Sequence, residues 1–237
     1  MNRPPVIIAL DFPDAASCEA LLAQWNEQAK PWIKVGYQLF YAVGPAWVAQ
    51  KKEEGYSIFL DLKLHDIPNT VAQGVKSLER LGVDILTLHA SGGSKMLEAA
   101  LEARTSERLK LIAVTQLTST DQQMLNHELG IKSSVEDSVL QLASIARSSK
   151  IDGVVCSGQE VTRIKNEIEP PFLTVVPGIR PKGHDTHDQK RIVTPTDAIH
   201  NGADYLVVGR PISKARSPRQ VYEQIVQEVQ EVKESQI

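Results

Sequence analysis

Short apolar runs alternate along this chain with longer stretches in which apolar residues recur every three or four positions. The apolar runs have the length and composition of strands in a parallel sheet that is covered on both faces. The longer stretches have the spacing of amphipathic helices, as Cys18, Leu21, Leu22 and Trp25 illustrate. We therefore predict strands at residues 6–10, 32–35, 57–60, 84–88, 109–114, 151–156, 172–176 and 204–208.

The order of these elements predicts the fold class. Helices are expected between the strands, for example near residues 45–54 and 160–167, and a last helix is expected around Val221 to Val232. Strands that alternate with helices in this way are typical of an α/β protein with a single (β/α)8 TIM barrel, which usually has about 250 residues. Because no linker or change of composition interrupts the sequence, we expect residues 1–237 to form one barrel domain.

An open, doubly wound sheet is the alternative fold. Such sheets often bind a dinucleotide through a G-x-G-x-x-G turn after the first strand. In this chain Asp11, Phe12 and Pro13 follow the first predicted strand. The barrel is therefore the preferred interpretation.

Charged residues crowd the end of the third predicted strand, where residues 61–66 read DLKLHD. Burying a charge costs several kcal/mol, on the order of the effective penalty in real proteins, unless an opposite charge and hydrogen bonds compensate it. Because side chains alternate along a strand, Asp61 and Lys63 are expected on one face and Leu62 and Leu64 on the other. This pattern predicts an ion pair where a core strand leaves the interior, and such a pair can be structural or functional.

Other polar residues follow other predicted strands. In a barrel the carboxyl ends of all strands converge on one mouth, where the active site lies. We therefore expect several residues that are far apart in the sequence to become neighbours there. They are Asp11, Lys34, Asp61, Lys63, Thr118, Arg180 and Arg210.

A phosphate group is the expected ligand of the last two loops. Barrels often bind phosphate with the loops after strands seven and eight, where backbone N–H groups and an arginine meet its oxygens. Here those loops contain residues 177–180 (PGIR) and the pair Gly209-Arg210, and Gln189 ends the polar stretch that follows. Residues 181–190 have little core-forming character and are predicted to fold over a ligand.

No metal is expected at this mouth. Asp61, His65 and Asp66 could in principle hold magnesium, but Lys34 and Lys63 bring two ammonium groups into the same space and would repel a dication. The alternating charges are expected to neutralise one another and to keep Lys63 protonated, as a general acid requires.

Composition narrows the class of ligand and compartment. The formal net charge of −3 argues against general affinity for nucleic acid or an anionic membrane. The two cysteines, Cys18 and Cys156, lack the spacing of metal ligands. No apolar run approaches the length of a membrane-spanning helix and no signal-type segment precedes the first strand, so we expect a cytoplasmic protein.

The sequence DLKLHDIPNT at residues 61–70 resembles the signature of orotidine 5′-monophosphate decarboxylases of the bacterial type, which catalyse the last step of pyrimidine (UMP) biosynthesis. The resemblance extends over nearly the whole chain. Other matching segments are residues 9–11 (ALD), 34–36 (KVG), 89–90 (HA), 116–119 (QLTS), 177–180 (PGIR), Gln189 and 208–210 (VGR).

The resemblance implies a decarboxylation of orotidine 5′-monophosphate to UMP that needs no cofactor, in a homodimer. By this likeness Lys63 delivers a proton to C6, Asp61 lies beside the departing carboxylate, and Lys34 completes the network. Asp66 and Thr70 would reach into the partner subunit's site. The implied substrate contacts are Asp11 and Lys34 to the ribose, Thr118 to the pyrimidine, and Arg180, Gln189, Gly209 and Arg210 to the phosphate.

Two other functions remain open from the sequence. A magnesium-dependent sugar-phosphate decarboxylase or synthase of the same barrel superfamily would share the Asp-x-Lys pattern. A non-catalytic nucleotide-binding barrel would share the phosphate loops, although it would not need Lys63. Activity in the presence of a chelator would exclude the magnesium-dependent enzyme. Loss of orotidylate absorbance would exclude the non-catalytic barrel.

Overall fold

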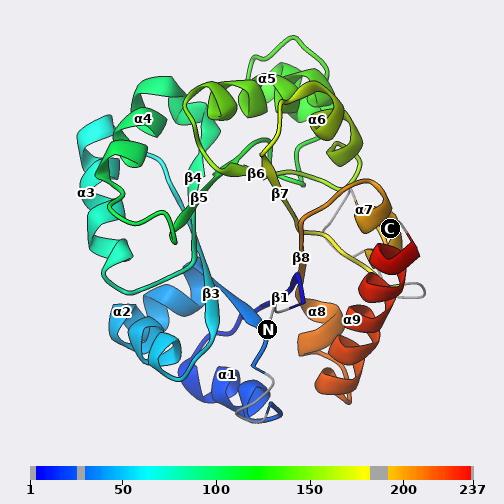
Figure 1. Ribbon diagram of the computed structural model, residues 1–237. Coiled ribbons are helices and arrows are strands. Elements are labelled where there is room, and N and C mark those ends of the chain that lie inside the picture. Colours follow the sequence, from blue (N-terminus) through cyan, green and yellow to red (C-terminus); the bar gives the residue numbers. More distant parts are fainter. Residues whose placement is uncertain (1–3, 26–29, 182–191, 236–237) are drawn as a thin grey trace.

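The computed structural model describes residues 4–25, 30–181 and 192–235. Eight parallel strands close into a barrel in chain order, and the first strand pairs with the last (Figure 1). The strands are β1 (Val6–Ala9), β2 (Trp32–Gly36), β3 (Ser57–Leu64), β4 (Ile85–His89), β5 (Lys110–Val114), β6 (Gly153–Val155), β7 (Leu173–Val176) and β8 (Tyr205–Val208). This arrangement confirms the predicted TIM barrel.

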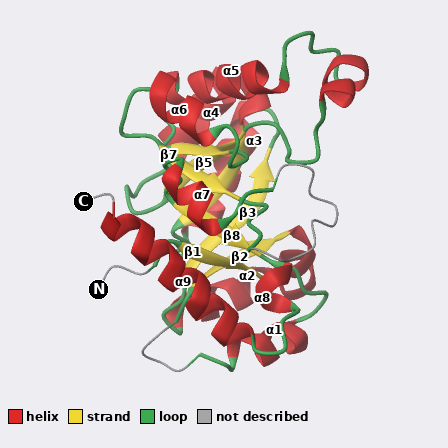
Figure 2. Cartoon of the chain, turned by 90° about the vertical axis from the view of Figure 1, so that its right-hand side faces the viewer, coloured by secondary structure: helices red, strands yellow, loops and turns green. Residues whose placement is uncertain are grey.

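Helices surround the barrel on all sides, so that the strands form its central layer (Figures 1 and 2). They are α1 (Ala15–Leu22), α2 (Tyr37–Glu53), α3 (Pro68–Glu79), α4 (Gly93–Ala103), α5 (Val135–Ser148), α6 (Val161–Glu167), α7 (Pro195–His200), α8 (Arg210–Ser213) and α9 (Pro218–Ser235). A 3-10 helix, η1 (Ala90–Gly92), and a π-helical turn, η2 (Met124–Glu128), lie in two of the loops. Among the described residues, no helix is long and apolar enough to cross a membrane.

Side chains of each strand alternate between two separate apolar cores. One core fills the inside of the barrel and contains Ile7, Phe59 and Ile112, among others. The other lies between the strands and the helices and contains residues such as Leu60 and Leu86. Because the inside is already filled by these side chains, polar residues on inward-facing positions are held near the mouth.

The second helix begins earlier than the sequence pattern predicted. It starts at Tyr37, directly after β2, rather than near residue 45. Gly44 has a φ of 73° within it, and Pro45 follows, so the helix is kinked there. The pattern had only revealed the part of α2 after this kink.

Two short helices near the carboxyl end were also missed. With six and four residues, α7 and α8 are too short to show a helical repeat. A start signal for α7 is present in the sequence, because Thr194 caps the backbone N–H of Asp197 and Pro195 occupies the first turn.

The third strand is longer than predicted and carries the charged residues within it. It continues to Leu64 rather than ending at Leu60. Its register against β4 is regular up to the pair Leu60 and Leu86 and shifts before the pair Leu64 and Leu88. Three residues of β3 therefore lie opposite Thr87 alone, and Asp61 and Lys63 are two of them.

Candidate active site

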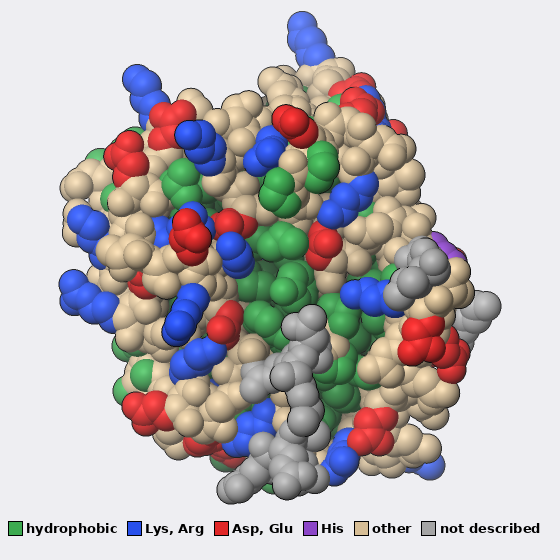
Figure 3. All heavy atoms as spheres, in the orientation of Figure 1, with side chains coloured by type: hydrophobic (Ala, Val, Ile, Leu, Met, Phe, Trp, Pro, Cys, Tyr) green, Lys and Arg blue, Asp and Glu red, His purple; other side chains and the backbone are tan. Residues whose placement is uncertain are grey.

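A pocket of about 550 Å³ opens at the carboxyl ends of the strands. Figure 3 shows the opposite face, at the amino ends of the strands, where hydrophobic side chains lie at the centre and charged side chains surround them. Eight residues that were predicted from the sequence line the pocket: Asp11, Lys34, Asp61, Lys63, Thr118, Arg180, Gly209 and Arg210.

The remaining predicted site residues are not in this pocket lining. Asp66, two residues before α3, and Thr70, in the first turn of α3, are both exposed. The Oδ1 atom of Asp66 accepts a hydrogen bond from the backbone N–H of Ile67 at 2.7 Å. Gln189 and the loop predicted to fold over a ligand, except Pro181, lie outside the described residues.

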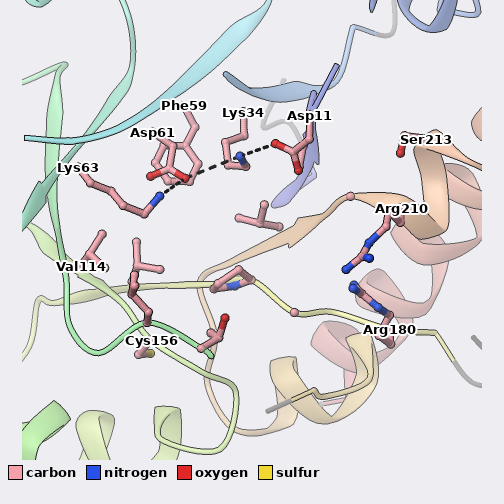
Figure 4. A pocket seen from close by; sticks show the side chains of 18 of the residues that line it. Asp11, Lys34, Phe59, Asp61, Lys63, Val114, Cys156, Arg180, Arg210 and Ser213 are labelled. Carbon is pink, nitrogen blue, oxygen red and sulfur yellow. Dashed lines mark hydrogen bonds and ion pairs between the residues drawn. The ribbon is translucent and has the colours of Figure 1, made fainter. Parts of the chain in front are cut away.

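Opposite charges alternate along one wall of the pocket (Figure 4). The Nζ atom of Lys34 lies 3.1 Å from Oδ1 of Asp11 and 3.7 Å from Oδ2 of Asp61. The same Oδ2 atom is 2.8 Å from Nζ of Lys63. The order is therefore carboxylate, ammonium, carboxylate, ammonium, and the last ammonium points into the pocket.

The carboxylate of Asp61 is held ionised by its surroundings. Burial raises its pKa, but the charges of Lys34 and Lys63 and hydrogen bonds from Lys63 and Thr87 together outweigh burial and lower the pKa below the ordinary value. The negative charge of Asp61 is thus present at neutral pH, between the two ammonium groups.

One aromatic ring lies close to the ammonium group of Lys63. The ring of Tyr37 lies 5.6 Å from Nζ of Lys63, within the range of a cation–π contact. Tyr37 also stacks on Tyr41 with ring centroids 5.8 Å apart. These contacts restrict the positions open to the ammonium group of Lys63.

Two histidine rings stack beside this network. The centroids of His65 and His89 are 5.2 Å apart. Burial, the neighbouring His65 and the charge of Lys63 all lower the pKa of His89, so its ring is neutral at pH 7. The Nδ1 atom of His89 lies 2.6 Å from the hydroxyl of Ser91.

Two guanidinium groups face each other at the other end of the pocket (Figure 4). Arg180 follows β7 and is almost fully buried, and Arg210 begins α8 after β8. Burial and then the charge of Arg210 lower the pKa of Arg180. Gly178, which precedes Arg180 in this loop, has a φ of 76°, a conformation that glycine adopts at little cost. Two cations held this close favour an anionic ligand such as phosphate.

Some lining residues were not singled out by the sequence reading. Phe12 lies beside Asp11, and Ser213 and Lys214 lie at the end of α8. The signal for the last two was weak because α8 itself was not predicted. Thr87, which lies outside the pocket lining, was also missed, although it is the one polar residue in the apolar run of β4 before His89.

Within the described residues, no group of three or more His, Cys, Asp or Glu side chains is gathered closely enough to hold a metal ion. Of the two carboxylates in the pocket, Asp11 is paired with Lys34, and Asp61 with both Lys34 and Lys63. The donor set of this pocket is therefore poor for a divalent cation.

Comparisons with known proteins agree on one family. Residues 4–225 match the family described as "Orotidine 5′-phosphate decarboxylase / HUMPS family". The orotidine 5′-phosphate decarboxylase of Staphylococcus saprophyticus is 48% identical over 221 residues, which cover 92% of this chain and 95% of the relative. That of Geobacillus thermodenitrificans is 47% identical over 230 residues, which cover 94% of this chain and 96% of the relative.

Solved structures are similar over almost the whole fold. The crystal structure of orotidine 5′-phosphate decarboxylase from Lactobacillus acidophilus has a TM-score of 0.86 and 39% identity, and the match covers 95% of this chain and 99% of that one. An uncharacterised conserved protein from Geobacillus kaustophilus has a TM-score of 0.83 and 42% identity, with 95% and 100% covered.

Proposed function

We propose that this chain, which belongs to the orotidine 5′-phosphate decarboxylase / HUMPS family, converts orotidine 5′-monophosphate to UMP and carbon dioxide. This reaction is the last step of pyrimidine biosynthesis. The family assignment makes the chain an enzyme of the carboxy-lyase class. The observation that carries the proposal is the Lys63 ammonium, 2.8 Å from Asp61 Oδ2, in a pocket whose far end holds two arginines. Residues 1–237 act as one catalytic domain in this proposal.

The reaction needs a cation beside C6 of the pyrimidine. Loss of carbon dioxide leaves an electron pair in an sp² orbital that the ring delocalises poorly, so the barrier is high, toward the upper end of the ~8–23 kcal/mol that enzymes commonly remove. An ammonium group stabilises the developing carbanion more than the reactant, which raises the rate. Lys63 supplies this charge and then donates its proton to C6.

Asp61 has two roles in this proposal. Its carboxylate fixes the direction of the Lys63 ammonium through the 2.8 Å contact. It also lies where the substrate carboxylate would stand, so that like-charge repulsion in the bound substrate disappears as carbon dioxide leaves. Lys34 balances the charge of Asp61 and of Asp11.

The rest of the pocket would hold the nucleotide. Asp11 and Lys34 bind the ribose hydroxyls, and Thr118 binds the edge of the pyrimidine. The phosphate would lie between Arg180 and Arg210, with the backbone of Gly209 beside it. This arrangement is supported by the positions of these residues along the pocket, with the lysines at one end and the arginines at the other. Gln189 is assigned to the phosphate by resemblance alone.

The proposed mechanism uses no metal and no cofactor. A metal would serve to neutralise negative charge, and in this pocket Lys34, Lys63, Arg180 and Arg210 already do so. The proton comes from Lys63, so no bound water needs to be activated.

A homodimer would complete the site. Asp66 precedes α3 and Thr70 lies in its first turn; both are outside the pocket lining and exposed in the single chain. Ile67, which follows Asp66, is 66% exposed, and Tyr41, whose ring stacks on that of Tyr37, is 75% exposed. Exposed large apolar side chains favour contact with a second copy of the chain, and such a contact would bring the partner's Asp66 and Thr70 to this pocket.

The deciding experiment is incubation of the purified chain with orotidine 5′-monophosphate and EDTA, following the loss of orotidylate absorbance. We expect activity in chelator from the wild type and none from Lys63→Ala. Activity that requires magnesium, or that occurs only with a sugar phosphate, would instead support the other enzyme class. Binding of UMP without any turnover of orotidylate would support a non-catalytic barrel.

Complementation tests the shared site separately. Chains with Lys63→Ala and chains with Asp66→Ala are each expected to be inactive. Mixed dimers should regain one working centre, because one of their two pockets combines an intact Lys63 with an intact Asp66 from the partner. If no mixture regains activity, each chain works alone.

A further inference from the structure

The third and fourth strands lose their register beside the charged network. Leu60 pairs with Leu86 and Leu64 pairs with Leu88, so β3 has two more residues than β4 between these pairs. The extra length takes residues 61–63 out of the regular ladder with β4, although Asp61 still pairs with Gly36 of β2. Backbone groups in this part of β3 therefore need partners other than the usual ladder bonds.

The side chain of Thr87 fills this gap. Its hydroxyl accepts a hydrogen bond from the backbone N–H of Lys63 at 2.8 Å and donates one to Oδ1 of Asp61 at 3.0 Å. One hydroxyl has a single hydrogen and two lone pairs, so both bonds are made by the same group without conflict. Thr87 is fully buried.

The backbone of Lys63 adopts an unusual conformation at this point. Its φ is 47°, in the left-handed region that non-glycine residues seldom adopt. Such a conformation persists only where the surrounding structure holds it, and it is common at functional sites. Here the bond from the Lys63 N–H to Thr87 holds the backbone that sets the direction of the Lys63 side chain.

Thr87 thus controls both members of the ion pair at once. Its hydroxyl binds the backbone N–H of Lys63 and the Oδ1 atom of Asp61. The other carboxylate oxygen of Asp61, Oδ2, accepts the hydrogen bond from the Lys63 ammonium. Thr87 does not line the pocket, so it acts on the substrate only through these two residues.

We propose that Thr87 is a positioning residue of the decarboxylation, whose hydroxyl aligns the Lys63 ammonium with the reacting carbon. The inference rests on the proposed function, because it assigns Thr87 a part in the same proton transfer. A misplacement of about 1 Å can lower a rate by about 100-fold even when it arises away from the reacting atoms.

The test compares three full-length variants with the wild type. Thr87→Val removes the hydroxyl and keeps the shape, and Thr87→Ser keeps the hydroxyl. Thr174→Val is the matched control, because Thr174 is also fully buried and its hydroxyl also meets a carboxylate, Asp204 Oδ2 at 3.1 Å, but at the amino end of the barrel.

Thr87→Val is expected to lower kcat about 10- to 100-fold, with little change in KM or in UMP binding. A second readout is exchange of the C6 hydrogen of UMP in heavy water, which uses the same lysine by microscopic reversibility and should slow in parallel. The acid limb of the pH profile should move to higher pH, because Asp61 loses a hydrogen bond that favours its charged form.

Thr87→Ser should restore most of kcat, and Thr174→Val should keep wild-type kcat although its thermal unfolding temperature falls. Should Thr87→Val fail to fold, Thr87→Cys retains the size with a weaker hydrogen-bonding group and should give a reduced kcat. A kcat for Thr87→Val equal to that of Thr174→Val, or a Thr87→Ser variant as slow as Thr87→Val, overturns the inference alone. A wild type that does not decarboxylate orotidylate overturns the proposed function, and the inference with it.

Discussion

Oδ2 of Asp61 lies 2.8 Å from Nζ of Lys63, although the two side chains leave the same strand only two positions apart. In a regular strand such neighbours point the same way and run side by side. Here the backbone of Lys63 is instead left-handed, with a φ of 47°. The carboxylate therefore meets the end of the lysine side chain, and the ammonium group is held at the pocket rather than in bulk solvent.

Lys63→Ala is predicted to remove both the cation and the proton donor. Loss of a general acid costs about 10²–10⁴-fold in rate, and loss of one electrostatic contact to the transition state a further ~10²–10³-fold. Binding of UMP, measured by calorimetry, should be retained because the ribose and phosphate contacts remain.

Lys110→Ala is the control for this change. Lys110 pairs with Asp152 at 3.3 Å at the start of β5, away from the mouth. Its removal should leave kcat unchanged. Turnover by Lys63→Ala close to that of Lys110→Ala would show that Lys63 is not the proton donor.

The Asp61 carboxylate predicts a dependence of stability on pH. Its folded-state pKa lies below the ordinary value of about 3.9 because its cations and hydrogen bonds outweigh burial. A group of this kind contributes stability above the pKa of the unfolded chain and loses it as pH falls through the folded pKa. The difference in unfolding free energy between wild type and Asp61→Asn should therefore be constant near neutral pH and should shrink in acid.

Urea unfolding between about pH 3 and pH 7 measures this difference, since carboxylates of unfolded chains titrate near ~4. Asp66→Asn is the control, because Asp66 is an exposed carboxylate in the loop between β3 and α3. A wild-type to Asp61→Asn difference that stays flat over the whole range would mean that the ion pairs do not lower the pKa of Asp61.

Much of the fold could be predicted because its signals are local. Each apolar run marked a strand, and the alternation of strand and helix was enough to predict a closed barrel. The errors lie where a residue's environment overrides the pattern. Tyr37 begins a helix that the Gly44-Pro45 break had concealed, and β3 continues through Asp61 and Lys63 although charged residues rarely occur in a buried strand.

The candidate site could be predicted in outline for a topological reason. Residues that follow different strands meet at one mouth in a barrel, so Asp11, Lys34 and Arg210 were expected together, and they line one pocket. Thr87 could not be predicted in the same way. Its importance comes from a shift in register between two strands, which no pattern in the sequence reveals.

Gly36→Ala is predicted to disturb the network without changing any charged residue. A Cβ on Gly36 would lie 3.1 Å from Nζ of Lys34 and 3.9 Å from Oδ1 of Asp11. The first distance is tighter than an ordinary methyl contact, so the ammonium of Lys34 must shift by a few tenths of an ångström, which disturbs its ion pairs with Asp11 and Asp61. We expect kcat/KM to fall about 10-fold, a loss of about 1.4 kcal/mol in transition-state binding.

Gly74→Ala is the matched control, because its Cβ would make an ordinary contact with Leu64 Cδ1 at 3.4 Å in the interior of α3. It should raise stability by roughly 0.5–1 kcal/mol, as alanine does in helices, with little effect on activity. Equal kcat/KM for Gly36→Ala and wild type would show that the position of Lys34 is not critical.

Asp152 is predicted to stabilise the amino end of the barrel without affecting turnover. Its Oδ2 atom accepts hydrogen bonds from the backbone N–H of Leu111 at 2.9 Å and from Arg104 at 2.6 Å. Asp84 and Asp204 bond the backbone N–H groups of Ile58 and Thr174 in the same way. Asp152→Ala leaves a strand N–H without its partner and should cost about 1–3 kcal/mol.

Chemical unfolding measures that cost, and steady-state kinetics at a temperature where the variant is folded measures turnover. Unchanged kcat and KM are expected because Asp152 lies at the end opposite the pocket. An Asp152→Ala variant with the stability of the wild type would show that Asp152 does not stabilise the amino end of the barrel. A folded Asp152→Ala variant with a lower kcat would show that Asp152 also affects turnover.

Arg210 is predicted to bind the phosphate group of the substrate. If Arg210 binds the phosphate, Arg210→Ala should lower kcat/KM for orotidine 5′-monophosphate about 10- to 100-fold, since a hydrogen bond to a charged group is worth about 1.5–3 kcal/mol. The same variant should treat orotidine, which has no phosphate, like the wild type. Arg219, paired with Glu223 at 2.8 Å on α9, provides the control substitution to alanine.

The comparison of the two substrates separates binding from catalysis. Binding energy from a remote phosphate can be used at the reacting centre, so removing the phosphate should lower kcat as well as raise KM. If only KM changed, the phosphate would hold the substrate without helping the reaction. If Arg210→Ala slowed orotidine as much as orotidine 5′-monophosphate, the arginine would act on some other part of the substrate, and the pairing of Arg180 with Arg210 around a phosphate would be wrong.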